Sequence, residues 1–452
     1  MEVALRSARR ADGAGICQWA REVQRMRIDH WLQAAQRGPH PTGTHRTRWG
    51  VVAGVVLAVA AVGSLAAVVM HLLGPPALMP VDLRVYLAGA RAIQSGSRLY
   101  GPGFDPGLRL PFTYPPIAAI LMVPLSVAGE RTLSLLWDAG SLAALAWAMY
   151  AVAGRPPGRS RWILAGTALA LVTQPVFDNL SLGQVDLFLM AAAVAGSLPR
   201  EGQAWRGAWV GLAAAVKVVP GLFILYLLLA RRWRPAAAAI GTWLALTGIG
   251  WALRPTSSVR YFTRLLWNVK RPGSPTSYLN QSLWGMVDRL ALGPWHTPVL
   301  AALLAALAVW GLSRALWLEH SGHAAAAAVA VGLVGVLASP ISWIHEAVWA
   351  ILALVVLTAA QVPPAAPADR LRLRAAAALA LVLAMRLPAL GARLAQAGVA
   401  LPLAGVLQDS VGLVAAVLLL ALFRTLHSAR PPAPVRAPLP PPPSGRGSHT
   451  SL

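Results

Sequence analysis

The chain has 452 residues, of which 57% are hydrophobic and 12% charged, and its formal net charge is +23. A soluble domain carries about 25% charged residues, so this composition excludes a protein that folds wholly in water and predicts an all-α polytopic membrane protein. The basic residues lie in short loops and tails between apolar runs, as the positive-inside rule describes, and this pattern gives no support to nucleic-acid binding.

The two ends of the chain differ from its middle. Residues 1–48 are polar and basic and too long for the charged region of a signal peptide, so we expect a cytoplasmic segment. The apolar run 49–73 would then remain as a membrane anchor, and residues 49–427 would form the transmembrane domain. The Pro-rich residues 428–452 are expected to form a disordered cytoplasmic tail, because such a composition does not build a packed core.

Further apolar runs predict a series of spans, about twelve crossings in all with the first. They cover residues 113–129, 132–153, 161–176, 183–199, 205–230, 235–253, 281–292 continuing into 296–318, 323–340, 344–361, 373–389 and 410–427. Alternation from a cytoplasmic N-terminus places both termini in the cytoplasm and the loops 74–112, 254–280 and 339–346 outside. The first two of these loops are basic, against the usual sorting preference. One explanation is that these loops bind an anionic partner. The other is that long loops follow the positive-inside rule poorly.

The first external loop contains "PVDLRVYLAGARAIQSGSRLY" (80–100), which predicts a helix over 82–95 ended by Gly96. Asp82 and Tyr86 would lie one turn apart on one face. Arg84 and Arg91 would form a stripe toward lipid phosphates, to which the planar guanidinium binds well. Considered alone, this pattern predicts an amphipathic interfacial anchor and does not identify an enzyme.

Two later spans contain unusual residues. Tyr114 precedes Pro115 and Pro116, which predict a rigid start for the second span. Lys217 lies about twelve residues from either end of its span, too deep for its side chain to reach the interface. We therefore expect it to face a polar cavity or an anion. Either a substrate phosphate or a carboxylate such as Asp186 or Asp138 would serve.

Four more segments follow the first loop in order. They are "LSLGQVDLFLMA" (180–191), "AAAVKVVPGLFILYLLLARRWR" (213–234), "YLNQSLWGMVDR" (278–289) and "ASPISWIHEAVW" (338–349). Together with the loop, this set resembles the polyprenol-phosphate-mannose-dependent mannosyltransferases of glycosyltransferase family 87, over roughly residues 50–425. The resemblance implies a GT-C-type bundle with interfacial helices in the first external loop. It also implies transfer of mannose from polyprenyl-phosphate-mannose to a phosphatidylinositol mannoside or lipomannan acceptor, on the extracytoplasmic face of the plasma membrane.

The resemblance assigns roles to individual residues. Asp82 would be the general base that takes the acceptor's hydroxyl proton, with inversion at the sugar carbon. His345 would be a second catalytic residue, although Glu346 stands where the family often has another histidine. The predicted donor-phosphate ligands are Lys217, Arg84, Arg91, Lys270 and Arg271. The predicted sugar or acceptor ligands are Tyr86, Tyr114, Gln184, Asn280, Gln281, Ser282, Trp343 and Glu346.

Structural explanations compete with several of these roles. Asp82 could cap a helix, as could Asn280 or Ser282, and His345 could be a hydrogen-bonded structural residue. A pentosyl (arabinofuranosyl) transferase with a polyprenyl-phosphate donor, or a lipid-linked sugar flippase, would share much of the pattern. No His, Cys or Glu residues stand at metal-ligand spacing, so we predict no metal and no tightly bound cofactor. The expected partners are membrane lipids, the donor and a glycolipid acceptor.

Overall fold

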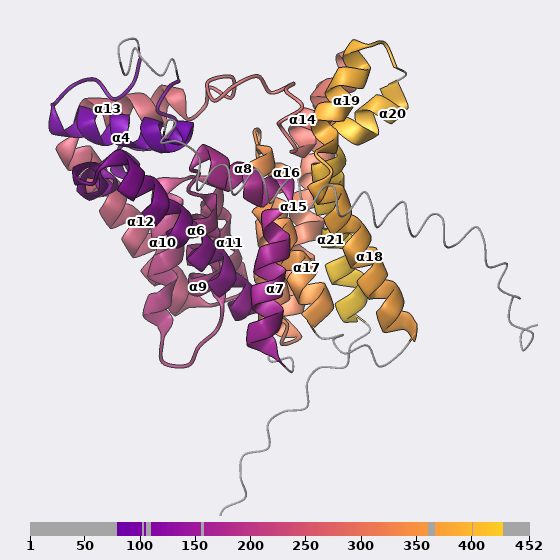
Figure 1. Cartoon of the computed structure of the whole chain (residues 1–452). Helices are drawn as coiled ribbons and strands as arrows, with labels where there is room; N and C mark the ends of the chain where they lie inside the picture. The colour runs from indigo at the N-terminus through magenta and orange to yellow at the C-terminus, as the bar shows by residue number, and fades with distance from the viewer. Residues whose placement is uncertain are drawn as a thin grey trace, which may run out of the picture. The chain divides into compact units, whose positions relative to one another are not determined.

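The computed structural model describes residues 79–101, 104, 110–154, 158–359, 367–399 and 401–427. The predicted basic segment 1–48, the first span 49–73 and the tail 428–452 lie outside the described residues. All described residues belong to one compact unit, Ala60–Leu452. Within it every regular element is helical, apart from an isolated bridge between Asn280 and Trp343 (Figure 1).

The helices follow the predicted order along the chain. In the first half these are α4 (Val81–Gln94), α5 (Pro116–Leu121), η2 (Val123–Val127), α6 (Glu130–Val152), α7 (Arg159–Leu171), α8 (Gln174–Leu182), α9 (Asp186–Ser197), η3 (Ala204–Arg206), α10 (Gly207–Val216), η4 (Val219–Gly221), α11 (Leu222–Leu229) and α12 (Trp233–Leu253). In the second half these are α13 (Pro255–Arg260), η5 (Tyr261–Leu265), α14 (Leu283–Arg289), η6 (Gly293–Trp295), α15 (His296–His320), α16 (Ala324–Ala338), η7 (Ile344–Val348), α17 (Trp349–Ala359), α18 (Pro367–Ala384), α19 (Leu387–Gln396), α20 (Leu401–Gln408) and α21 (Ser410–His427).

The long apolar helices make this an integral membrane protein. In the described part of the chain three are long and apolar enough to cross a bilayer: Glu130–Val152, Trp233–Leu253 and Gly293–His320. Three bent pairs raise that number to six if each pair is one span, and five shorter apolar helices of 10–17 residues accompany them. The expected count of about twelve crossings therefore stays a prediction.

Several predicted spans are broken, and prolines or left-handed residues mark the breaks. The run predicted as one span over 161–176 is instead α7 and α8, bent by 74° before Pro175. The run predicted over 373–389 ends at Ala384, and α19 continues at 57° after Arg386 in the left-handed region. Between α14 and α15, Ala291 and Gly293 have positive φ angles and precede Pro294. The continuous spans expected at these places were wrong, because a proline cannot continue a helix past its preceding turn.

The predicted span 205–230 contains the break that matters for the site. Helix α10 ends at Val216, and Lys217 is extended (φ −140°, ψ 136°) before η4 and α11 resume. Pro220 explains this, because its ring would clash with the carbonyl of Val216, four residues earlier. Lys217 therefore lies on extended backbone between two half-helices rather than in the middle of a continuous helix.

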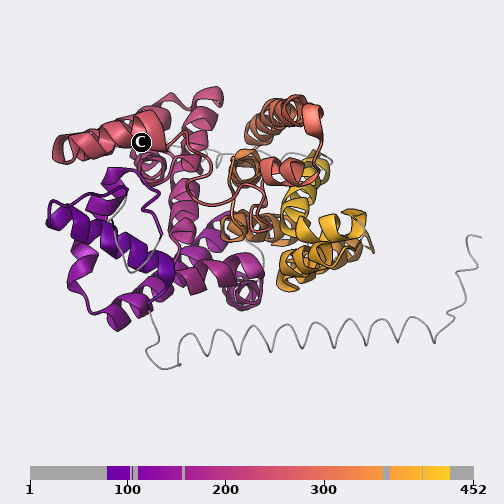
Figure 2. The same ribbon diagram turned by 90° about the horizontal axis from the view of Figure 1, so that it is seen from above.

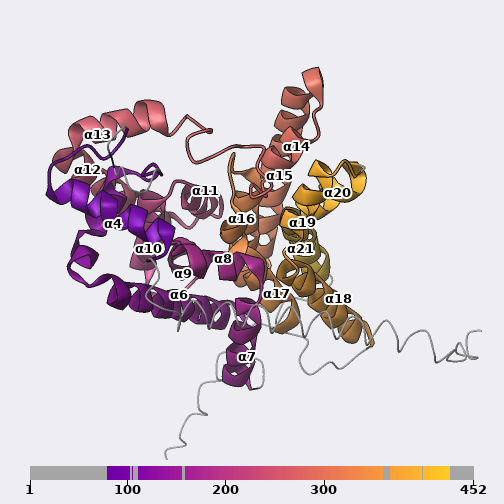
Figure 3. The ribbon, with the colours of Figure 1, turned by 45° about the horizontal axis from the view of Figure 1, so that its top comes forward.

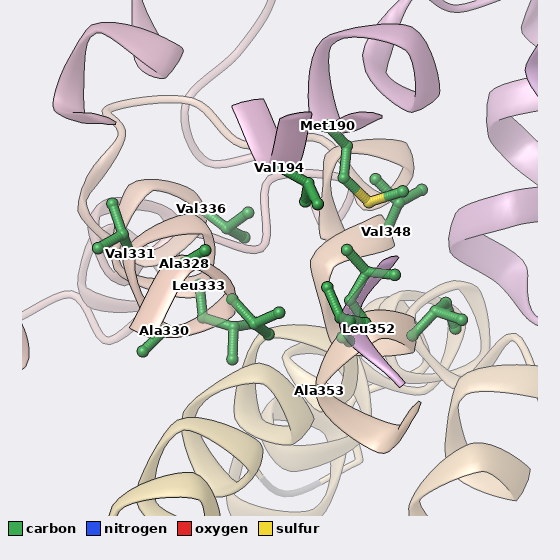
Figure 4. Packing of buried hydrophobic residues seen from close by; sticks show 14 of the residues in the cluster. Met190, Val194, Ala328, Ala330, Val331, Leu333, Val336, Val348, Leu352 and Ala353 are labelled. Atoms are coloured by element: carbon green, nitrogen blue, oxygen red, sulfur yellow. The ribbon is translucent and has the colours of Figure 1, made fainter. Parts of the chain in front are cut away.

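Small residues allow close packing around this break. Gly207 and Gly211 lie one turn apart on α10, and an added Cβ at either would overlap a backbone carbonyl of α12, that of Pro235 or Ala239. This small-xxx-small spacing is typical of membrane helix pairs. On the other side, α9, α16 and α17 interdigitate through buried aliphatic side chains, including Met190, Leu333 and Leu352 (Figure 4). The half-helices are thus held from both sides.

The first external loop gives the predicted helix. Helix α4 covers Val81–Gln94, and Gly96 follows with φ +70°. Pro116 opens α5 as expected. In Figure 1 α4 and α13 lie at the same end of the molecule, and Figure 2 looks onto that end. The predicted loop 254–280 also contains regular structure that the sequence did not indicate, namely α13 and the π-helical turn Tyr261–Leu265.

Candidate active site

The site is built around the turn between α8 and α9. Helix α8 ends at Leu182, and Gly183 adopts a left-handed conformation with φ +71°. The amide of Gln184 donates to the carbonyl of Asn179 at 2.8 Å and that of Gly183 to Leu180 at 3.0 Å, the pattern of a Schellman cap. The chain then turns at once into α9, whose first residue is Asp186. This cap places Gln184 and Asp186 two residues apart at the head of α9.

Gly183 also allows α4 to approach the turn. A Cβ at this position would lie 2.8 Å from the Cβ atoms of both Leu83 and Pro80. Only glycine fits both the left-handed backbone and this contact. The adjacent Gly183 and Gln184 of the segment 180–191 thus have a physical basis: the glycine allows α4 to pack against the residue that follows it.

Gln184 joins Asp82 to two tyrosines. Its Nε2 donates to Asp82 Oδ2 at 2.7 Å, while its Oε1 accepts from the Tyr86 hydroxyl at 2.7 Å and from Tyr114 at 3.3 Å. The two hydroxyls lie 3.1 Å apart. Because the tyrosine protons are directed at the amide oxygen, the amide nitrogen faces the carboxylate. The predicted shared face of Asp82 and Tyr86 on α4 is confirmed, since both reach Gln184.

Asp82 is perturbed by its surroundings. Burial raises the pKa of its carboxyl from 3.8 to about 6, and the neighbouring Asp186 adds to this rise. The hydrogen bond from Gln184 and the charge of Lys217 act in the opposite direction. Asp82 lies in the first turn of α4, but the N-cap is Pro80 and no side-chain cap bond is present there. The alternative that Asp82 is only a helix cap thus receives no support.

Lys217 is held between two carboxylates. Its Nζ lies 2.7 Å from Asp186 Oδ1 and 2.9 Å from Glu346 Oε1, and all three side chains are largely buried. Ser342 donates to the second oxygen of Glu346 at 3.3 Å. Of the two partners considered for Lys217, the carboxylate Asp186 is therefore present in the structure. Binding of the donor phosphate by Lys217 remains a prediction, as does binding of the sugar by Glu346.

His345 lies beside the same ion pairs. Its Nε2 is 3.6 Å from Asp186 Oδ2, too far for a hydrogen bond, and the residue is buried in η7. Asp186 thus contacts Lys217 with one oxygen and faces His345 with the other. The segment Gln184–Asp186 connects the Asp82 group to the Lys217 group, so residues from four of the five predicted motifs meet here. The sequence predicts Asp186 only as one possible partner of Lys217, and its position beside His345 is visible only in the structure.

The Asn-Gln-Ser segment is bonded to the protein. Asn280 Nδ2 donates to the carbonyls of Pro275 (2.9 Å) and Pro340 (3.1 Å), and its Oδ1 accepts from Ser342 N at 2.9 Å. Ser282 caps α14 by accepting from Gly285 N at 3.2 Å, which confirms the capping alternative.

The side chain of Gln281 also bonds to the backbone. Its Nε2 donates to the carbonyls of Tyr278 and Gln408, and its Oε1 accepts from the amide of Gly412. Arg289 reinforces the segment by donating to Ser277 O at 2.7 Å and to Asn280 O at 2.8 Å. Trp343 pairs its backbone with Asn280. Sugar contacts by Asn280, Gln281, Ser282 and Trp343 stay untested predictions, and their observed partners are structural.

The predicted basic ligands lie in different places. Arg91 is exposed and pairs with Glu130 at 3.7 Å. Arg271 donates to the carbonyl of Phe112 and lies over the ring of Tyr100, with its Cζ 5.2 Å from the ring centroid. Lys270 beside it is exposed, and Arg84 is half-buried on α4. Arg271 and Tyr114 thus share Tyr100 as a neighbour, because the Tyr100 hydroxyl donates to the carbonyl of Tyr114 at 2.7 Å.

Two cavities adjoin the site. A small one of about 40 Å³ is lined by Asp186, Lys217 and Glu346 together with apolar residues of α11 and α16. A larger one of about 390 Å³ begins at Pro115 and Val218 and is lined by aliphatic and aromatic side chains of α11, α12 and η5. Among the described residues, no group of three or more His, Cys, Asp or Glu side chains is arranged to hold a metal ion.

Comparison with known proteins identifies relatives over much of the chain. The profile of glycosyltransferase family 87 matches residues 112–340, a range that includes Gln184 and Lys217 but not Asp82 or His345. The polyprenol-phosphate-mannose-dependent alpha-(1-2)-phosphatidylinositol mannoside mannosyltransferase of Mycobacterium tuberculosis is 32% identical over 300 residues, 61% of this chain and 70% of the relative. The polyprenol-phosphate-mannose-dependent alpha-(1-2)-phosphatidylinositol pentamannoside mannosyltransferase of Mycolicibacterium smegmatis is 35% identical over 290 residues, 60% of this chain and 67% of the relative.

Among solved structures, ArnT from Cupriavidus metallidurans is similar in its apo state and bound to undecaprenyl phosphate. Each match has 20% sequence identity and a TM-score of 0.32, and it covers 84% of this chain and 78% of the other.

Proposed function

Because this chain belongs to glycosyltransferase family 87, we propose that it transfers mannose from polyprenyl-phosphate-mannose to a phosphatidylinositol mannoside or lipomannan-type acceptor. The chain is a glycosyltransferase, and the names of its relatives motivate this donor and this acceptor. We further propose a GT-C-type bundle of about twelve crossings with the site on the extracytoplasmic face of the plasma membrane. The short and broken apolar helices, which coincide with predicted spans, support that count.

One observation carries the chemical proposal: Asp82 accepts a hydrogen bond from Gln184, a residue within the family match. An alcohol is a weak nucleophile, so the reaction needs a base for the acceptor's hydroxyl proton. Asp82 is half-buried with a pKa of about 6, so it is ionised and able to accept a proton at neutral pH. Tyr86 and Tyr114 fix the amide of Gln184, and the amide fixes the carboxylate. The arrangement suits a preorganised general base.

In the proposed step, the Asp82 carboxylate removes the hydroxyl proton as the acceptor oxygen attacks the anomeric carbon. The bond between that carbon and the phosphate oxygen breaks on the opposite face, so the configuration inverts. The departing polyprenyl phosphate is stable as an anion and needs no acid. Asp82 ends the step protonated and returns the proton to water.

The donor's position is proposed from charge and polarity. Arg271 and Lys270 lie beside the stretch that leads to Tyr114 and are the candidate phosphate ligands. The apolar cavity of about 390 Å³ begins next to Tyr114 and Lys217 and supports placement of the first isoprenoid units there. Lys217 itself has two carboxylate partners, so its proposed role is to hold Asp186 and Glu346 in place.

The experiment uses sealed vesicles that contain the purified protein and labelled polyprenyl-phosphate-mannose with a phosphatidylinositol mannoside. We expect labelled, mannose-extended glycolipid. Movement of the label between leaflets without product would instead identify a flippase. Efficient transfer from polyprenyl-phosphate-arabinose but not from the mannose donor would identify a pentosyltransferase. Either of these results would overturn the proposal.

A further inference from the structure

A third cavity, which is basic, lies away from Asp82, at the other end of α4. It has a volume of about 370 Å³ and is formed by the turn after α4, residues 96–100, and by the end of α12 together with α13, residues 253–260. Three arginines line it, Arg98, Arg254 and Arg260, together with the hydroxyl residues Ser97, Thr256 and Ser257. No acidic residue is among the described residues that line it. Figure 3 shows the two segments next to each other, at α4 and α13.

The arginines are partly positioned before any ligand arrives. Arg254 donates to the carbonyl of Ser97, and Arg260 donates to that of Tyr100 at 3.1 Å. Each guanidinium has five N–H donors, so these bonds leave most of them available. Arg98 is exposed in the turn between the two. Three cations with spare donors around one cavity form a site for an anion with several oxygens, such as a phosphate.

The position of the cavity indicates which phosphate it would bind. Helix α12 is apolar over 21 residues, which corresponds to about 31 Å of helix and matches the hydrocarbon thickness of a bilayer, about 30 Å. The cavity begins where this helix ends, at Leu253 and Arg254. It therefore lies at the level of lipid headgroups.

The arginines of the cavity lie beyond the end of α4 that is opposite to Asp82. Asp82 lies in the first turn of α4, and the cavity begins after the last residue, Gln94. Twelve residues of helix separate them by about 18 Å. Tyr100 contacts the candidate ligands of both phosphates, because its carbonyl accepts from Arg260 and its ring lies under Arg271. We therefore assign a phosphate at Arg254 and Arg260, at the end of α4 away from Asp82, to a second molecule beside the donor.

We infer that Arg98, Arg254 and Arg260 bind the phosphodiester of an anionic phospholipid. Two lipids can supply it: the phosphatidylinositol anchor of the acceptor, or bulk anionic lipid of the membrane. In the first case the site would hold the anchor while the sugar end reaches Asp82. This part of the inference rests on the proposed function, whereas the anion site itself does not.

The binding test needs no catalysis. Purified protein is titrated with a short-chain phosphatidylinositol below its micelle concentration, and retained lipid is measured by native mass spectrometry. The Arg254→Gln/Arg260→Gln variant should bind it about tenfold more weakly, and Arg98→Gln should weaken binding without disturbing the bonds to Ser97 and Tyr100. The matched control is Arg264→Gln, which removes an exposed arginine of the next turn, outside the cavity. Equal binding by the wild type and all variants would overturn the inference.

The kinetic test distinguishes the two lipids. If the acceptor anchor occupies the site, the variants raise KM for a phosphatidylinositol mannoside about tenfold and leave KM for a phosphate-free alkyl mannoside unchanged. If bulk lipid occupies it, wild-type turnover of the alkyl mannoside rises with the phosphatidylglycerol content of the vesicles, and the variants lose this response. Equal losses with both acceptors at every lipid composition would show a purely structural role and overturn the inference. If the wild type transfers no mannose at all, the proposed function fails while the binding test still decides the anion site.

Discussion

Gln184 Nε2 lies 2.7 Å from Asp82 Oδ2, although 102 residues separate the two along the chain. The amide nitrogen faces the carboxylate because two tyrosine hydroxyls occupy the amide oxygen. The orientation of the Asp82 carboxylate is thus set by Gln184, a residue from another motif. Predictions follow for both residues.

The first prediction concerns the pH dependence of the wild-type enzyme. The pKa of Asp82 is raised to about 6, and only the ionised carboxylate accepts a proton. We expect kcat/KM for mannose transfer to be constant above pH 7 and to fall about tenfold per pH unit below pH 6. A radiolabel assay over pH 4.5–8.5, with protein recovery checked at each pH, measures this. A rate that stays level down to pH 4.5 would contradict the assignment.

The second prediction concerns Gln184→Ala. Loss of the hydrogen bond removes an interaction that lowers the pKa of Asp82, so the acid limb of the pH profile should move to higher pH. At pH 7 we expect roughly tenfold slower transfer, with partial recovery at pH 8.5. Gln203→Ala, an exposed glutamine in the α9–α10 connection, is the control and should match the wild type. A slower variant with an unshifted profile would mean that Gln184 does not act through Asp82.

A third prediction tests the turn that brings these residues together. Gly183→Ala would strain a left-handed residue and press its Cβ against Leu83 and Pro80. We expect a loss of about 1–3 kcal/mol in the free energy of unfolding, together with slower transfer because α4 carries Asp82. Gly241→Ala in α12 meets no atom within 4 Å and serves as the control. Thermal unfolding in detergent measures the difference, and equal stability of the two variants would contradict the close approach.

The fourth prediction concerns Lys217, which has two buried carboxylate partners. Lys217→Met would leave Asp186 and Glu346 without their cation, at a cost of about 3–5 kcal/mol in folding free energy. The triple variant with Asp186→Asn and Glu346→Gln should recover much of this loss, because it removes the unpaired charges. The exposed Lys270→Met should change stability by less than about 0.5 kcal/mol. If the triple variant is less stable than Lys217→Met, the ion pairs with Asp186 and Glu346 do not explain the contribution of Lys217 to stability.

Much of the fold follows from the sequence because apolar runs and breakers act locally. The helix over 82–95 and the start at Pro116 were predicted and are confirmed, and Ser282, one of two residues considered as the cap of the helix that follows it, is the cap. The breaks within predicted spans were missed, although Pro175, Pro220 and Pro294 mark three of them. Hydropathy over a window records the apolar run and not the proline that divides it.

The site was only partly predictable, for a different reason. The motifs supplied Asp82, Gln184, Lys217 and His345, but not their pairings, which depend on how distant helices pack. Gly183 illustrates this, since its positive φ and its contact with Leu83 appear only once α4 meets α8. Asn280 shows the reverse, because a residue whose chemistry suits sugar hydroxyls is bonded to the backbone at Pro275, Pro340 and Ser342.

The most direct measurement is the mannose-transfer rate of Asp82→Asn, which keeps the size of the side chain and removes its basicity. The control is Asp369→Asn in α18, where the carboxylate pairs with Arg372. A general base contributes a factor of about 10² to 10⁴, so we expect Asp82→Asn to lose at least a hundredfold in kcat at pH 7 while it remains folded and the control retains full activity. An Asp82→Asn enzyme that transfers mannose at the wild-type rate would contradict the account.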